Sequence, residues 1–116
     1  MYEVVFYRTA AGNEPALDWF RALDAEERRI VGRDLRLLQL GFPMGMPLCK
    51  SLGDGLWELR STLPKKIVRV IFFLDGQSFI VAHGFIKKSQ KTPKVELDAA
   101  KARMKTYKTA DQERRS

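Results

Sequence analysis

The most distinctive segment of the sequence is residues 83–93, which read HGFIKKSQKTP. This segment places three lysines directly after a predicted strand, and it ends where a helix is predicted to begin. The first backbone N–H groups of a helix have no partners within the helix, so they also bind anions. The chemistry that these residue types and their spacing indicate is a phosphate or other anion site.

Two arginines on the neighbouring predicted strands extend this basic region. Arg60 and Arg69 each alternate with apolar residues, so both could point out of an open face of the sheet, where a phosphate backbone could lie. The alternative is a solvated or ion-paired strand residue, with Glu58 and Asp75 as available partners, because an interior charge must be paired. Alternation alone leaves both interpretations open.

The single histidine, His83, shares one side of its predicted strand with Val81 and Phe85. A lone histidine on a strand is more often a half-buried packing residue than a catalyst. Beside several cations, however, the neutral imidazole would be favoured, and a neutral imidazole can act as a general base near pH 7. This second interpretation requires His83 to lie close to the lysines and arginines.

Other catalytic chemistries have no support in the sequence. There is no Walker loop, no Rossmann glycine fingerprint and no Cys/His grouping with zinc spacing, so no metal and no cofactor are expected. Cys49 and His83 are too far apart in the chain to suggest a nucleophile pair. The lone cysteine, the lack of a long apolar run and the lack of a signal peptide indicate a cytoplasmic protein without membrane association.

The charge distribution points to a polyanionic partner. The chain has 116 residues, enough for one core, and a formal net charge of +7. Residues 1–55 contain seven Lys/Arg and eight Asp/Glu, a net of −1, whereas residues 56–116 contain fourteen and six, a net of +8. Such asymmetry favours nucleic acid as the partner over a basic surface kept for solubility.

The first half of the chain predicts one strand and two helices. Residues 3–8 are rich in β-branched and aromatic side chains and indicate a strand. A short helix follows, with Pro15 in its first turn, and a second helix begins at Asp24 in a capping box with Glu27. Gly41 is a reasonable end for the second helix, and the two helices look like an antiparallel hairpin. Residues 41–55 are rich in glycine and proline and are predicted to form a loop.

The second half predicts three strands, at residues 56–61, 67–75 and 78–86, and a final helix that opens at Pro93 with Thr92 as its N-cap. The predicted order is β-α-α-β-β-β-α. This order indicates an α+β fold with a small, mainly antiparallel sheet, one face covered by helices and the other open or partly open. Residues 1–108 form the predicted single domain, and residues 109–116 a polar, frayed tail.

Three motifs in order resemble a known family. They are GLWELR at residues 55–60, Arg69-Val70 with Phe72-Phe73, and HGFIKKSQKTP followed by a helix. Together they resemble the phage-derived Gp49-like, HigB-type branch of the RelE/ParE toxin superfamily, over roughly residues 3–107. The resemblance implies a RelE-like fold and a toxin of a type II toxin–antitoxin system.

Such toxins are typically ribosome-dependent endoribonucleases that cut mRNA and inhibit translation. The resemblance therefore implies mRNA and the ribosome as targets, and a cognate antitoxin, commonly with a helix-turn-helix domain, as partner. In the reaction that the resemblance implies, the ribose 2′-hydroxyl attacks the adjacent phosphorus without a metal and the bond to the 5′-oxygen breaks. The products are a 2′,3′-cyclic phosphate and a free 5′-hydroxyl. The enzyme must orient the RNA, move protons and stabilise charge on the phosphorane.

The resemblance also implies roles for the basic residues. Arg69 stands where these enzymes contact phosphate, Lys87 and Lys88 match basic positions after the last strand, and His83 is the candidate base with a lysine as the alternative. The full expected set is Arg69, His83, Lys87 and Lys88 as catalytic residues and Lys50, Arg60, Lys91 and Lys94 as RNA-binding residues.

Two alternatives remain, and the first of them shares the same fold. The first is a ParE-like toxin that inhibits DNA gyrase by binding and cuts nothing. The second is a non-catalytic nucleic-acid-binding module from a phage. Substitution of Arg69, His83 and Lys88 discriminates the ribonuclease from the gyrase inhibitor, because it should abolish RNA cleavage in the first case and leave toxicity largely intact in the second. Expression of a non-catalytic binding module should be harmless.

Overall fold

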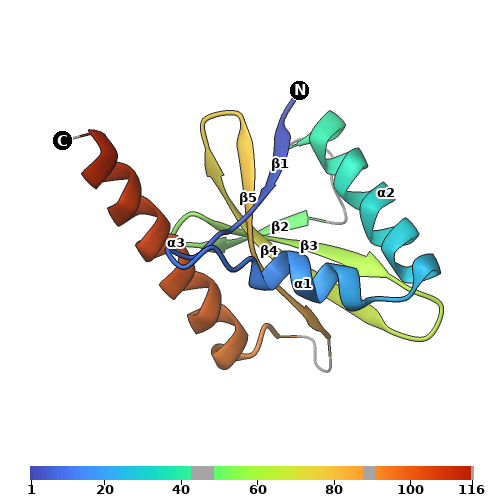
Figure 1. Ribbon diagram of the computed structural model, residues 1–116. Helices are drawn as coiled ribbons and strands as arrows, with labels where there is room; N and C mark the ends of the chain where they lie inside the picture. The colour runs from blue at the N-terminus through green and yellow to red at the C-terminus, as the bar shows by residue number, and fades with distance from the viewer. Residues whose placement is uncertain (43–48, 88–90, 116) are drawn as a thin grey trace.

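The computed structural model describes residues 1–42, 49–87 and 91–115 and shows an α+β fold (Figure 1). Lys88 lies outside the described residues. In chain order the elements are β1 (Glu3–Phe6), α1 (Pro15–Ala22), α2 (Ala25–Gly41), β2 (Cys49–Gly53), β3 (Leu56–Thr62), β4 (Ile67–Asp75), β5 (Ser78–Ile86) and α3 (Lys94–Arg115). The predicted fold class is confirmed.

The five strands form one sheet in the order β1-β5-β4-β3-β2. β1 runs parallel to β5, and the other pairs are antiparallel, so the prediction of a mainly antiparallel sheet is confirmed. β4 and β5 are joined by the predicted tight turn: Asp75 pairs with Ser78, and Gly76 has a φ of 57°. A left-handed φ at this position suits glycine, because a side chain there is strained.

The strand β2 corrects the prediction that residues 41–55 form only a loop. It is an edge strand that pairs with β3, with Lys50 opposite Glu58. Most of its side chains are exposed, so its sequence has no alternation of apolar and polar residues. Its position depends on backbone pairing with β3, which the local sequence does not show.

α1 begins at Pro15, in agreement with the sequence, and α2 begins and ends as its sequence predicts. Asp24 and Glu27 form the capping box, with the Glu27 N–H donating to Asp24 Oδ1 at 2.8 Å and the Asp24 N–H donating to Glu27 Oε1 at 3.0 Å. α2 ends at Gly41. Instead of packing mainly on one another as a hairpin, α1 packs on β5 and α2 packs on β3 and β1.

Both faces of the sheet carry a core. One core lies under α1 and α2 and includes Val31, Leu38, Phe72 and Phe79. Trp19 of α1 and Gly84 of β5 are closely packed beside it: a Cβ on Gly84 would lie 2.3 Å from the Trp19 ring. This close approach requires glycine on β5.

The other face is partly covered by α3, which lies on the opposite side of the sheet from α1 and α2 (Figure 1). Ala100 is fully buried there, and Tyr107 packs against Phe73. α3 begins at Lys94 and continues to Arg115, so the prediction of a frayed tail from residue 109 is wrong. Ion pairs of Arg114 and Arg115 with Asp111 stabilise its last turn. No helix within the described ranges is long and apolar enough to cross a membrane.

Candidate functional site

The face of the sheet toward α3 carries four of the predicted site residues, Lys50, Arg60, Arg69 and His83. Residues directly opposite one another on neighbouring strands project from the same face. One row across the sheet runs from Lys50 through Glu58 and Ile71 to His83. The next row contains Arg60, Arg69 and Phe85.

Glu58 and Arg69 form a buried ion pair at the centre of this face. Arg69 Nη1 lies 3.1 Å from Glu58 Oε1 and 3.4 Å from Oε2, and their side chains are 2% and 1% exposed. Of the two interpretations that the sequence left open for Arg69, the ion-paired one is observed, and Glu58 is the partner. The physical reason is that α3 and the segment that precedes it cover this part of the sheet.

The Thr92 hydroxyl forms hydrogen bonds with both members of this ion pair. It donates to Glu58 Oε2 at 2.6 Å and accepts from Arg69 Nη1 at 3.1 Å. Thr92 therefore holds the segment before α3 against the sheet, whereas the sequence predicted that it would cap the helix. The helix begins two residues later, at Lys94.

Further cations surround this network. Lys50 Nζ lies 3.8 Å from Glu58 Oε1 while most of its side chain is exposed, and Arg60 is exposed beside Arg69. The Lys87 N–H donates to the Ile67 carbonyl at 2.7 Å, which holds it at the end of β5. Partial burial and then the charges of Arg69, Arg60 and Lys50 lower the pKa of Lys87, and Glu58 opposes them.

A hollow of about 480 Å³ lies next to these cations. It is lined by Lys50, Ser51, Leu52, Lys91, Thr92 and Leu97. Its volume lies within the range of about 300–1,000 Å³ that is common for ligand sites. The hollow places Lys91 beside Lys50, although the two residues are far apart in sequence. We refer to Lys50, Arg60, Arg69, Lys87 and Lys91 as the basic cluster.

His83 belongs to a separate network beneath α3. Its Nδ1 lies 3.2 Å from Arg103 Nη1, and its Nε2 lies 2.9 Å from Glu96 Oε1. Because a guanidinium can only donate, Nδ1 accepts from Arg103, and Nε2 carries the hydrogen that is donated to Glu96. Arg103 also donates to the Ala82 carbonyl at 2.6 Å. Both ring nitrogens therefore hold α3 on β5.

One predicted site residue lies apart from the others, and three residues that contact the predicted ones were not assigned a site role from the sequence. Lys94 is exposed and forms an ion pair with Asp98 at 2.9 Å, away from the network of Glu58. Glu96 and Arg103 were not predicted as partners of His83, although their spacing of seven residues places them on one helix face. Glu58 was predicted only as a possible ion-pair partner, and its position between the apolar residues Trp57 and Leu59 is the signal that the sequence offers.

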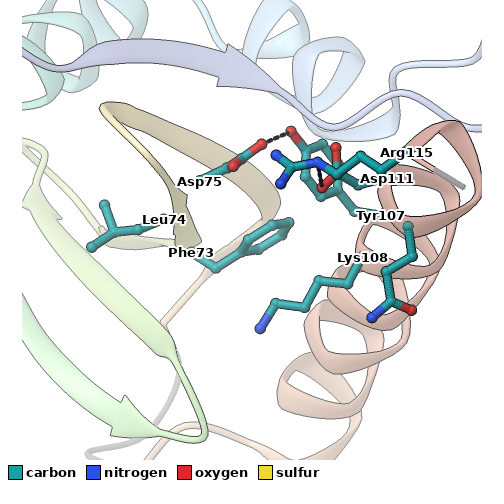
Figure 2. Close-up of a pocket in the computed structure, with 8 residues that line it drawn as sticks. Phe73, Leu74, Asp75, Tyr107, Lys108, Asp111 and Arg115 are labelled. Carbon is teal, nitrogen blue, oxygen red and sulfur yellow. Dashed lines mark hydrogen bonds and ion pairs between the residues drawn. The ribbon is translucent and has the colours of Figure 1, made fainter.

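A second hollow, of about 360 Å³, lies between the end of β4 and the second half of α3 (Figure 2). The Tyr107 hydroxyl points at Asp75 there and donates to Oδ2 at 2.5 Å. Burial, this hydrogen bond and the Asp75 charge raise the pKa of Tyr107 to about 12. Asp75 and Arg69 are separated by roughly 20 Å along β4, so this hollow is distinct from the basic cluster.

The metal-binding potential of the chain is limited in the described part. Within residues 1–42, 49–87 and 91–115, no three His, Cys, Asp or Glu side chains are grouped so that they could hold a metal ion. The half-buried Cys49 lies near the same carboxylate as the cations: burial and the Glu58 charge raise the pKa of its thiol to about 11.

A protein-family model matches most of the chain. Residues 18–105 match the sequence model of the family described as phage-derived protein Gp49-like (DUF891). This range covers most of the chain, including α2, the whole of β2 to β5 and the first half of α3. No curated protein matches the chain.

Proposed function

Because the chain belongs to the phage-derived Gp49-like family, which is related to the RelE and HigB toxins, we propose that it is the toxin of a type II toxin–antitoxin pair. We further propose that it is an endoribonuclease that cleaves mRNA on the ribosome. The observation that supports this activity is the basic cluster. Five consecutive parts of the chain, from β2 to the segment before α3, each contribute one cation to it.

The exposed members of the basic cluster are suited to bind the RNA backbone. Lys50, Arg60 and Lys91 reach solvent, so they can contact phosphates on either side of the reacting bond. Arg69 lies behind them in its pair with Glu58, which balances its charge, so the exposed cations supply the positive potential. This potential stabilises the charge that develops when the 2′-hydroxyl attacks the phosphorus and the 5′-oxygen leaves.

Removal of the 2′-hydroxyl proton needs a base, and we assign this role to Lys87 rather than to His83. The pKa of Lys87 is lowered, so a larger fraction of its amine is neutral and able to accept a proton. His83 already accepts from Arg103 through Nδ1, and it would have to break this hydrogen bond to accept a proton there. In this proposal His83 holds α3 in place, and Lys87 moves the proton.

A pair of substitutions tests this assignment. We expect Lys87→Met to lower kcat for RNA cleavage by about 10²–10⁴-fold and to remove the rise of the rate with pH, because a positioned base contributes about this much. We expect His83→Gln to retain that rise. The measurement is a pH–rate profile of both variants with wild type and Lys105→Met, an exposed lysine of α3, as the control. The opposite pattern would assign the base to His83.

Expression in a bacterium tests the proposed function as a whole. We expect growth arrest together with new 5′-hydroxyl ends within translated mRNA, mapped across the transcriptome. Lys87→Met should abolish both effects, and Lys105→Met should retain both. Growth arrest that persists in Lys87→Met without new RNA ends would support a gyrase-binding toxin instead. Harmless expression of the wild type would support a non-catalytic nucleic-acid-binding module.

The family relationship also supports a protein partner. We propose a cognate antitoxin, a second small protein with a helix-turn-helix domain that neutralises this chain in the cytoplasm. Co-expression with the product of an adjacent reading frame should restore growth, and the two proteins should copurify. Failure of every neighbouring product to restore growth would contradict this pairing.

A further inference from the structure

One carboxylate contacts three different parts of the basic region at once. Glu58 Oε1 lies 3.1 Å from Arg69 Nη1 and 3.8 Å from Lys50 Nζ, and Oε2 accepts from the Thr92 hydroxyl at 2.6 Å. These partners come from β4, from β2 and from the segment before α3. Glu58 itself is 1% exposed, so its position is determined by the surrounding protein.

The sheet register makes this arrangement possible. Lys50 is directly opposite Glu58, and Arg69 is diagonal to it, because Glu58 pairs with Ile71 two residues along β4. Side chains at these positions on one face are within reach of one another. A buried carboxylate is costly unless cations and hydrogen-bond donors compensate it, so the low-energy arrangement is the one in which all three partners stay on Glu58.

We propose that Glu58 is the positioning residue of the basic cluster: its buried carboxylate holds Arg69, Lys50 and Thr92 in one arrangement. Glu58 touches neither the RNA nor the reacting atoms, and it acts through these three residues and through the effect of its charge on Lys87. The inference rests on the proposed function for its catalytic consequence. The arrangement itself is a property of the folded chain and can be measured without RNA.

The charge of Glu58 also acts on Lys87, which lies near it at the end of β5. Arg69 of β4, Arg60 of β3 and Lys50 of β2 all disfavour a proton on the Lys87 amine, and Glu58 is the carboxylate that opposes them. Removing the Glu58 charge without changing its shape should therefore move the titration of Lys87 to lower pH. A side chain with only a packing role would leave that titration unchanged.

The first experiment measures this titration in the protein without RNA. The ¹³Cε resonance of Lys87, assigned by its loss in Lys87→Met, is followed by NMR from pH 6 to pH 11 in wild type and Glu58→Gln. We expect the midpoint to shift to lower pH in Glu58→Gln. A folded Glu58→Gln variant with an unchanged midpoint would overturn the proposal.

The second experiment measures cleavage. In Glu58→Gln we expect kcat to fall on the order of 10–100-fold, because small displacements of positioned groups have effects of this size. We expect KM to change much less, because Arg60 and Lys91 still bind phosphate. The rising limb of the pH–rate profile should shift to lower pH together with the Lys87 titration. A Glu58→Gln variant with the kcat and pH profile of the wild type would contradict the positioning role.

A matched pair at Thr92 keeps the test decisive if Glu58→Gln does not fold. Thr92→Val removes the hydroxyl but keeps the shape and the Glu58–Arg69 pair, and Thr92→Ser restores the hydroxyl. We expect kcat to fall in Thr92→Val and to recover in Thr92→Ser, and equal kcat in both folded variants would overturn the proposal. If wild type cleaves no RNA at all, the proposed ribonuclease function fails. The Lys87 titration needs no RNA, so it still tests the role of Glu58.

Discussion

The phenol of Tyr107 has a definite partner, and this partner makes its contribution to stability pH-dependent. Its hydroxyl donates to Asp75, and its pKa is raised to about 12. A raised pKa in the folded state means that the stabilisation is fully present below the unfolded-state pKa of about 10 and is lost as the pH rises through about 12.

We predict that Tyr107→Phe lowers the free energy of unfolding by about 1 kcal/mol at pH 7, because Asp75 loses a hydrogen-bond donor. The difference between wild type and Tyr107→Phe should become smaller between pH 10 and pH 12. Urea unfolding of both proteins at pH 7 and pH 11 measures it. An equal difference at both pH values would show that the hydroxyl is not the group responsible.

Individual residues of the site were predictable to different degrees. The basic character of Lys50, Arg60, Lys87 and Lys91 follows from the sequence, but the buried state of Arg69 does not. Alternation on a strand shows that Arg69 faces away from Val68 and Val70, and it does not show whether a helix covers that side. The docking of α3 decides this, through contacts such as Thr92 with Glu58 that link distant parts of the chain.

At the scale of elements, α1 packs on β5 through a contact that leaves no room for a side chain at Gly84. We predict that Gly84→Ala lowers the free energy of unfolding by about 1–3 kcal/mol, because a Cβ would overlap the buried part of the Trp19 ring.

The control is Gly32→Ala in α2, where a Cβ would meet nothing within 4 Å. That change should stabilise the protein by about 0.5–1 kcal/mol, since alanine is the better helix former. Thermal and urea unfolding of the two variants test the pair. Equal effects of the two substitutions would contradict the role of the Trp19 contact.

The elements also show why some boundaries were predictable and others were not. The start of α2 was predictable because the capping box of Asp24 and Glu27 is made by residues three positions apart. β2 was not predictable because its exposed side chains carry no pattern and its partner strand begins after the Gly53–Gly55 turn. The extension of α3 to Arg115 was missed because its last turns are polar, and ion pairs to Asp111 support them.

At the scale of the whole molecule, the net charge of +7 should act mainly through the basic cluster. We predict that binding of single-stranded RNA weakens with salt, and that each phosphate neutralised by a cation contributes about 0.7 to the slope of the logarithm of affinity against the logarithm of salt concentration. Lys91→Ala should reduce the slope by about this amount, and Lys105→Ala should not change it. Fluorescence anisotropy with labelled RNA across a salt series measures the slopes. Equal slopes in Lys91→Ala and wild type would place Lys91 outside the RNA-binding surface.

The parallel pairing of β1 with β5 joins the first strand of the chain to a strand that begins at Ser78. During synthesis β1 therefore has no strand to pair with until most of the chain has left the ribosome, and pairings between such distant residues form slowly. The sheet that presents the basic cluster is completed only late in translation. For a protein proposed to act on ribosomes, this order of folding means that the chain becomes active only after most of it has been synthesised.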